Sequence, residues 1–250
     1  MIKLKSQQDI ELIKQGGRIL RQVLDEIKPV LKAGVSTDHI DRMLDAKILD
    51  YGGEPGFKRV PGYKWASCLC INDQVVHTPP SGRRLGEGDI FTIDCGVYHH
   101  GFHTDAADTI IIGQGPNEKK QAFLDAGKKT LDKAIEVAKA GNRIGHISRL
   151  IDTQINQAGY SIIKELTGHG LGVDLHEDPV IPGFLNEPLE QTPQIVPGMV
   201  LAIEVIYAES SAKIKSEAGD RWSLVTDNGD LSACFEKTIA ITDKETLILT

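Results

Sequence analysis

Four segments of the chain carry hydrophobic residues at helical spacing, with an apolar position every three or four residues. The expected helices cover residues 6–31, 36–51, 118–140 and 144–158. A glycine follows each of them closely, which is a common stop signal for a helix. At the first helix we expect Ser6 to be the N-cap, with Asp9 three residues later in a capping-box-like pattern.

Shorter apolar runs, several of them alternating with polar residues, predict β-strands. The expected strands cover residues 66–72, 75–78, 91–112 (a hairpin), 160–166, 199–208, 221–226, 231–242 and 246–249, and the expected loops cover 54–65, 79–88 and 176–197. Two helices followed by strands thus occur twice. This order predicts an α+β fold of two similar halves with a site where they meet. No Ser/Gly-rich linker divides the halves, so we expect a single domain over residues 1–250.

The hairpin brings two aspartates close together. Its turn is expected at residues 98–101, and in a hairpin symmetric about that turn Asp94 and Asp105 are directly opposed. Such a pair has Cβ atoms about 4.5–5.5 Å apart. Two carboxylates held that close share a proton or a cation. The alternative, two solvated residues on an exposed sheet face, is equally compatible with the hairpin taken alone.

Three further polar residues lie in apolar or glycine-rich stretches. Glycines flank His169 and permit close backbone approach to its imidazole, while Glu204 and Glu236 interrupt apolar strands. Each residue alone is more often a surface or structural residue. Together, two Asp, two Glu and one His form a mainly oxygen-donor set that suits a pair of divalent ions.

Composition and charge exclude several classes of protein. The 250 residues carry a net charge of −7 without a Lys/Arg cluster, so neither nucleic acid nor an anionic membrane is indicated as a partner. No apolar run reaches the roughly 18–20 residues of a membrane span, and the N-terminal segment turns polar too early for a secretory signal. We therefore expect a cytoplasmic protein. Its cysteines, Cys68, Cys70, Cys95 and Cys234, lie in apolar contexts and are expected to be reduced, mostly buried thiols.

The polar residues above belong to longer segments that closely resemble the type I methionine aminopeptidases. The matching segments are VVHTPP at 75–80, GDIFTIDCGVYHHGFHTDAADT at 88–109, TGHGLGVDLHEDP at 167–179, PGMVLAIE at 197–204 and SACFEKTIAIT at 232–242. The resemblance covers essentially the full chain. It implies the pita-bread (creatinase/aminopeptidase) fold, with two pseudo-symmetric helix-helix-strand halves around an antiparallel sheet, and one catalytic domain over 1–250. The implied reaction is hydrolytic removal of the N-terminal methionine from peptides and nascent proteins.

The resemblance also implies a role for each polar residue. The ligands of two divalent metal ions (Co, Mn, Fe or Zn) would be Asp94, Asp105, His169, Glu204 and Glu236, with Asp105 and Glu236 bridging the ions. Glu204 would also act as general base toward the attacking water. His77 would hydrogen-bond near the scissile bond or the departing amine. His176 would help polarise the carbonyl and stabilise the oxyanion.

The methionine pocket of that family is matched less closely. Tyr63, Cys68 and Trp222 fall at expected pocket positions. Phe57, Val60 and Leu175 stand where a Cys, a Tyr and a Phe are usual, and Thr-Pro-Pro follows His77 where a Gly-Ile-Pro is more usual. A thioether needs a flexible apolar slot, and these residues still supply apolar surface. The stringency for Met and for the second residue is left open.

Two other interpretations compete with this one. The run GLGVDLHEDP is reminiscent of Xaa-Pro aminopeptidases of the same fold, although those usually carry an extra N-terminal domain. A non-catalytic binding protein on this fold typically lacks metal ligands, whereas all five are present here. The preferred interpretation implies a monomer acting on peptide and nascent-protein N-termini, with association with the ribosome as a family-level expectation.

Overall fold

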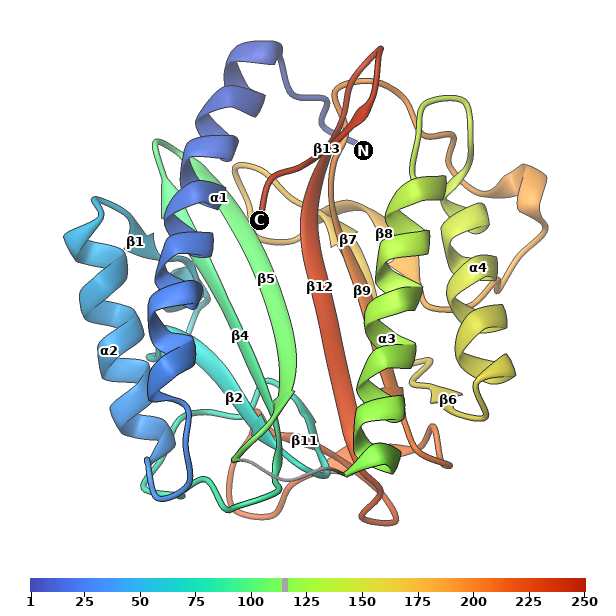
Figure 1. The fold of residues 1–250 in the computed structure, drawn as a ribbon. Coiled ribbons are helices and arrows are strands. Elements are labelled where there is room, and N and C mark those ends of the chain that lie inside the picture. The colour runs from blue at the N-terminus through green and yellow to red at the C-terminus, as the bar shows by residue number, and fades with distance from the viewer. Residues whose placement is uncertain (114–116) are drawn as a thin grey trace.

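Two pairs of helices enclose a layer of strands in the computed structural model, which describes residues 1–113 and 117–250 (Figure 1). The first pair, on the left of the view, is α1 (Gln7–Ile27) and α2 (Thr37–Asp50). The second pair, on the right, is α3 (Glu118–Val137) and α4 (Ile144–Gln157). All four predicted helices are confirmed.

The strands form two large sheets and one small one. They are β1 (Glu54–Pro55), β2 (Ser67–Ile71), β3 (Gln74–Val76), β4 (Ile90–His99), β5 (Phe102–Ile111), β6 (Ser161–Ile162), β7 (Thr167–Gly170), β8 (Glu177–Pro182), β9 (Val200–Ala208), β10 (Ile214–Ser216), β11 (Leu224–Thr226), β12 (Ser232–Ile241) and β13 (Thr246–Ile248). The first large sheet has the order β1-β4-β2 with β5 on β4, and the second has the order β13-β12-β9-β7-β8 with β6 on β9. The small sheet is β10-β11-β3. Strands β5 and β12, the neighbours across the middle of Figure 1, bring the two large sheets together.

Each half has its own apolar core beneath its helix pair. In the first half, Leu20 of α1 and Ile40 of α2 belong to the same buried cluster as Phe91 of β4. In the second half, Phe123 of α3 and Phe235 of β12 belong to another. Helix α1 begins as predicted, because the Ser6 side chain accepts a hydrogen bond from the Asp9 backbone N–H at 3.2 Å and the Asp9 carboxylate accepts one from the Ser6 backbone N–H at 2.8 Å.

The turn of the central hairpin lies one residue later than predicted, so the pairing of its two arms shifts by two residues. Its turn residues are His100 and Gly101, with φ of 49° and 90°, so that His99 pairs with Phe102. A two-residue turn of this kind requires positive φ at both central positions, and placing glycine there is easier than placing a second histidine. The prediction that Asp94 and Asp105 are directly opposed is therefore wrong.

Several segments also differ from the prediction: β1 lies inside the expected loop 54–65, and β7 was not expected as a strand. Strand β8 lies inside the expected loop 176–197, where Pro179 and Pro182 obscured its alternating burial. The short strand β10 was not expected, and the expected strand 160–166 is reduced to β6. Within residues 1–113 and 117–250, no helix combines the length and apolar character needed to cross a bilayer.

Candidate active site

One row of residues crosses both large sheets where they meet. Cys68 on β2 pairs with Asp94 on β4, and Asp94 pairs with Ala107 on β5. On the other sheet, Glu236 of β12 pairs with Glu204 of β9. Because residues aligned in this way share a face of a sheet, the row places three carboxylates on one surface.

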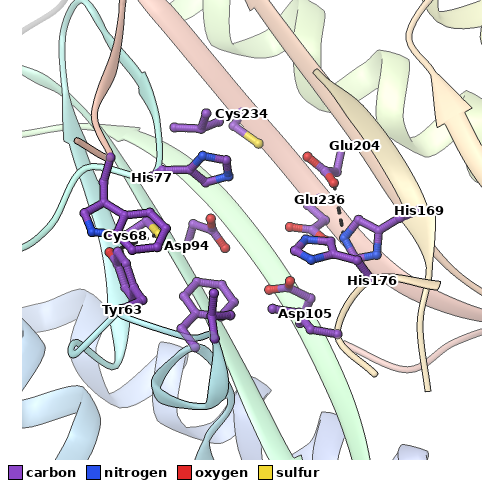
Figure 2. Close-up of a pocket in the computed structure, with 15 residues that line it drawn as sticks. Tyr63, Cys68, His77, Asp94, Asp105, His169, His176, Glu204, Cys234 and Glu236 are labelled. Atoms are coloured by element: carbon purple, nitrogen blue, oxygen red, sulfur yellow. Dashed lines mark hydrogen bonds and ion pairs between the residues drawn. The ribbon is translucent and has the colours of Figure 1, made fainter. Parts of the chain in front are cut away.

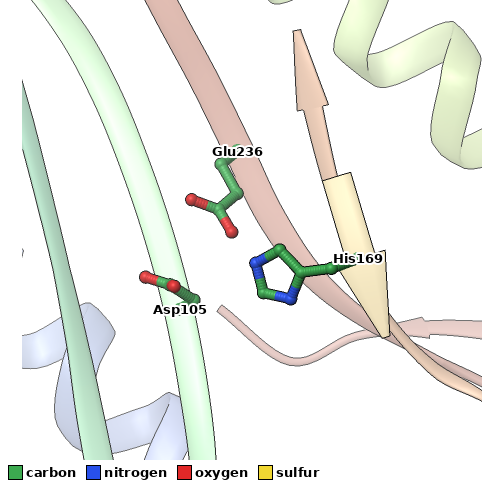
Figure 3. Close-up of side chains that lie close together, drawn as sticks. All are labelled: Asp105, His169 and Glu236. Atoms are coloured by element: carbon green, nitrogen blue, oxygen red, sulfur yellow. The ribbon is translucent and has the colours of Figure 1, made fainter. Parts of the chain in front are cut away.

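Asp105 and His169 lie diagonally beside this row. Asp105 is on the same face of β5 as the row, and His169 on β7 is aligned two residues away from Glu204 along β9. Ligand atoms of Asp105, His169 and Glu236 all lie within 4.8 Å of one another (Figure 3). The His169 Nε2 atom is 3.5 Å from a Glu204 carboxylate oxygen, the dashed contact in Figure 2. The five predicted metal ligands thus converge from β4, β5, β7, β9 and β12.

The four carboxylates lie where their charged forms are disfavoured. Burial and the charges of Asp105 and Glu204 raise the pKa of Asp94 well above its usual value, and burial raises the pKa of Asp105 to about 7. Burial and neighbouring carboxylates also raise the pKa values of Glu204 and Glu236. Among the described residues that line this site there is no lysine or arginine. Full ionisation of the four acids therefore requires a cation from outside the chain.

The donor atoms fit a divalent metal. Within the described part of the chain, Asp94 Oδ1 and Glu236 Oε1 are buried without a hydrogen-bond partner, which is costly for a polar atom. The His169 Nδ1 atom is 2.9 Å from the Gly170 carbonyl oxygen. We assign the ring proton to this nitrogen, which leaves the lone pair of Nε2 free to bind a metal. Burial lowers the pKa of His169 to about 4, so the imidazole is neutral, as a metal ligand must be.

All predicted site residues line a single cavity of about 160 Å³ (Figure 2). These lining residues are Phe57, Val60, Tyr63, Cys68, His77, Asp94, Asp105, His169, Leu175, His176, Trp222, Glu204 and Glu236. Val76 and Cys234 line it as well, and they were not among the predicted site residues. The sequence held a signal for both, because Val76 precedes His77 and Cys234 shares a strand face with Glu236.

Two histidines stand at the mouth of the cavity. His77 and His176 are exposed, yet the surrounding protein lowers the pKa of each. Both are therefore neutral near pH 7, with one ring nitrogen donating and the other accepting. The His176 ring centroid is 4.4 Å from that of His169. His77 follows β3 with φ of 61°, a conformation that is uncommon outside glycine and concentrates at functional sites.

Opposite the carboxylates, the cavity has an apolar wall. Phe57, Tyr63, Cys68 and Leu175 form a buried cluster, with Trp222 packed against it. The Tyr63 and Trp222 rings meet edge to face with centroids 5.1 Å apart. The Tyr63 hydroxyl donates a hydrogen bond to the Ser67 carbonyl oxygen at 2.8 Å, so its polar end has a partner within the protein. The wall is uncharged and suits a flexible apolar side chain.

The cysteines agree with the prediction of reduced, buried thiols. All four are free and buried. Burial raises the pKa of Cys70 to about 12 and raises those of the other three well above the usual value. They are therefore protonated at neutral pH, and a thiolate nucleophile is not expected at this site.

Comparison with known proteins agrees with this geometry. The chain belongs to metallopeptidase family M24, because residues 11–243 match that family. Within the family, its relatives are methionine aminopeptidases: those of Clostridium perfringens and Bacillus subtilis are each 37% identical over 100% of this chain and 99% of their own length. Membership confirms the predicted class of enzyme and implies the use of divalent metal ions.

Solved structures confirm the predicted pita-bread fold. The crystal structure of methionine aminopeptidase from Thermotoga maritima has a TM-score of 0.95 and 33% identity, covering 100% of this chain and 99% of that one. Prolidase from Pyrococcus furiosus, with a TM-score of 0.78, is 19% identical and shares the fold alone. This chain covers only 65% of that prolidase. The methionine aminopeptidases are therefore favoured over the proline-specific alternative.

Proposed function

We propose that this protein is a metal-dependent methionine aminopeptidase, which hydrolyses the peptide bond after the N-terminal methionine of peptides and nascent proteins. The observation that carries this proposal is the arrangement of four buried or half-buried carboxylates and one neutral histidine facing an apolar wall in one small cavity. The full-length likeness to methionine aminopeptidases supports it over the Xaa-Pro alternative. One catalytic domain over 1–250 is part of the proposal, since both halves contribute to the site.

The residues proposed to hold two divalent ions are Asp94, Asp105, His169, Glu204 and Glu236. Bound ions would supply Lewis-acid polarisation of the scissile carbonyl and lower the pKa of water. The oxygen-rich donor set admits Co, Mn, Fe or Zn. On this basis each carboxylate that repels its neighbours in the metal-free protein becomes a ligand when the ions bind.

Glu204 is the proposed general base. It is half-buried at the edge of the cavity, and burial with the charge of Asp105 raises its pKa. A carboxylate with a pKa closer to neutrality exchanges a proton with water more effectively than an ordinary one. Glu204 would take the proton from the attacking water and pass it to the departing amine.

The two histidines at the cavity mouth are proposed to contact the scissile peptide. As neutral imidazoles they donate hydrogen bonds without requiring a charge. His176, beside His169, would donate to the carbonyl oxygen as negative charge develops on it. His77 would hydrogen-bond near the scissile nitrogen or the departing amine.

Substrate selection is assigned to the apolar wall. Tyr63, Cys68 and Trp222 would contact the methionine side chain, with Phe57 and Leu175 completing the slot. A thioether packs well against aromatic rings, and no charged group lies in this wall to favour a polar side chain. We also propose a cytoplasmic monomer that meets nascent chains near the ribosome.

Metal titration tests the centre of this proposal. Metal-free protein is titrated with Co²⁺ or Mn²⁺ by calorimetry, which gives the number of ions bound per chain. This number is compared with the metal content of the protein as purified. We expect two metal ions to bind per chain. Chelator should remove both ions and at the same time abolish the release of Met from Met-Ala-Ser. Peptide hydrolysis that is unaffected by chelator would contradict the proposal.

A further inference from the structure

The two large sheets meet at a seam that lacks a backbone hydrogen-bond ladder. Strand β5 pairs with β4, and β12 pairs with β9 and β13, but none of the described strand pairings joins β5 to β12. The two strands nevertheless lie side by side (Figure 1). The N–H and C=O groups that each strand turns toward the seam are buried and need partners.

Two threonine hydroxyls supply those partners in a reciprocal way. Thr238 on β12 accepts a hydrogen bond from the Asp105 N–H at 3.0 Å and donates to the Asp105 carbonyl oxygen at 2.8 Å. Thr109 on β5 accepts from the Cys234 N–H at 3.1 Å and donates to the Cys234 carbonyl oxygen at 2.7 Å. A hydroxyl has one donor and two acceptor sites. Each threonine therefore satisfies both backbone groups of one residue across the seam.

These contacts fix how the two halves of the site are aligned. Asp105 lies beside Thr238, and Cys234 lies beside Thr109. Ala107, midway along β5, consequently faces Glu236, midway along β12. The candidate ligands on these two strands belong to different sheets, so the seam determines how far apart their carboxylates are held.

The two threonines differ in what they hold. Thr238 binds the backbone of Asp105, which is itself a candidate ligand. Its own N–H donates to the Thr250 hydroxyl at 2.9 Å, which anchors it from the other side. Thr109 binds Cys234, which is not a candidate ligand, and its hydroxyl is also 2.9 Å from that of Thr92. Both threonines are buried. Removing either hydroxyl should therefore lower the stability to a similar extent, whereas only removal of the Thr238 hydroxyl should affect metal binding.

We propose that Thr238 is a positioning residue of the metal centre, whose hydroxyl holds the backbone of Asp105 at the distance from Glu236 at which both carboxylates can bind metal. This inference rests on the proposed metal centre. Thr109 closes the same seam without positioning a ligand. Groups that orient metal ligands are important for affinity, and their loss costs about 10–100-fold in metal binding.

The test compares Co²⁺ binding by metal-free wild type, Thr238→Val, Thr238→Ser and Thr109→Val. Valine is nearly isosteric with threonine but has no hydroxyl, whereas serine keeps the hydroxyl. Calorimetry gives the affinity, the visible absorption of bound Co²⁺ reports its ligand geometry, and thermal unfolding gives the stability. We expect Thr238→Val to bind Co²⁺ about 10–100-fold more weakly with an altered spectrum, and Thr238→Ser to resemble wild type. Thr109→Val is expected to lose similar stability but keep wild-type affinity and spectrum.

Wild-type Co²⁺ affinity and spectrum in Thr238→Val would overturn the inference. An equal loss of affinity in Thr109→Val would overturn it as well, because the effect would then belong to the seam in general. If the wild-type protein binds no Co²⁺, the proposed metal centre is wrong and so is the inference that rests on it. This result differs from the two above, in which the wild-type protein does bind Co²⁺. If Thr238→Val does not fold, Thr238→Ala replaces it, because a water molecule can enter the space left by the side chain and bond the buried backbone groups there. It is expected to weaken binding in the same direction, and unchanged binding would again overturn the inference.

Discussion

Glu204 and Glu236 are directly opposed across strands β9 and β12. Opposed residues in antiparallel strands have Cβ atoms about 4.5–5.5 Å apart, and like charges there are destabilising. Burial and nearby carboxylates raise the pKa values of both. The metal-free fold therefore carries an electrostatic cost in its active site, which bound cations are expected to remove.

Replacing Glu236 with Gln should stabilise the metal-free protein and weaken its response to metal. The amide removes one repelling charge at nearly constant size, and each pH unit by which a pKa is displaced corresponds to about 1.4 kcal/mol. We expect a gain of about 1–2 kcal/mol in urea unfolding with chelator near pH 8. Mn²⁺ should then stabilise the variant far less than wild type. Glu245→Gln, at an exposed position, is the matched control. A Glu236→Gln protein that is less stable than wild type with chelator present would argue against repulsion among the site carboxylates.

The metal-free protein should also lose stability as the pH rises above about 6.5. The site carboxylates have raised pKa values, that of Asp105 reaching about 7, so the folded state binds more protons than the unfolded state and stability falls with rising pH. Below that pH the histidines act in the opposite direction. Burial lowers the pKa values of His103 and His169 to about 4, so there the unfolded state binds more protons. The net fall is therefore expected only above the pKa of unfolded histidine.

Urea unfolding at about pH 6.5 and pH 8 checks this pH dependence, with chelator in one series and saturating Mn²⁺ in the other. The chelated protein should be less stable at the higher pH. Mn²⁺ should abolish or reverse the difference, because the charged carboxylates are then ligands. A chelated protein whose stability rises over this interval contradicts the account.

The hairpin shows what the sequence could and could not supply. Alternating residues located both arms, and the polar residues in apolar surroundings identified Asp94 and Asp105 as candidates. The pairing of the arms depends on which two residues occupy the turn. With positive φ at His100 and Gly101, the turn lies one residue later than predicted and the pairing shifts by two residues. The pairing of Glu204 with Glu236 joins residues of separate strands, and no local pattern specifies such a contact.

Strand β8 shows a second limit. Its residues alternate between buried and exposed, but two prolines in six residues favour a loop when only the sequence is considered. The strand is held by its pairing with β7, which the sequence does not reveal. The resemblance to a family supplied the candidate site residues despite this error, because the motif around His169 and His176 was recognised independently of its secondary structure.

His77 should be required for turnover and dispensable for folding and metal content. It lines the cavity without belonging to the candidate ligand set. His77→Ala is expected to lower kcat/KM by about 10²–10³-fold, in the range found when a transition-state hydrogen-bond donor is removed. His77→Asn is the sharper variant, because asparagine tolerates the left-handed backbone at this position. His39→Ala, on the exposed face of α2, is the control, and full activity in both His77 variants would remove the assigned role.

A buried ion pair at the start of β8 should contribute strongly to stability. The Lys5 Nζ atom is 2.6 Å from a Glu177 carboxylate oxygen, and the two side chains are only 5% and 2% exposed. Glu177 directly follows His176 in the chain. Lys5→Met is expected to destabilise the protein by about 3–5 kcal/mol, because it removes the buried, closer cation of Glu177 and leaves only Lys3, whose Nζ atom is 3.7 Å from that carboxylate.

The double variant Lys5→Met/Glu177→Gln distinguishes the ion pair from simple packing. It should recover much of the lost stability, since neither partner then carries a buried charge. Lys58→Met, which removes an exposed pairing with Asp45, is the matched control and should change stability by less than about 1 kcal/mol. If the double variant is no more stable than Lys5→Met, the effect does not come from the uncompensated charge.

Side-by-side cleavage of short peptides tests the central claim most directly. Metal-reconstituted protein is given Met-Ala-Ser, Met-Pro-Ser, Leu-Ala-Ser and Ala-Pro-Ser, each with and without chelator, and the released amino acid is quantified. The account predicts chelator-sensitive release of Met, with Leu-Ala-Ser and Ala-Pro-Ser cleaved much more slowly. Preferential cleavage of Ala-Pro-Ser, or no cleavage of any peptide by protein that has bound its metal ions, would contradict it.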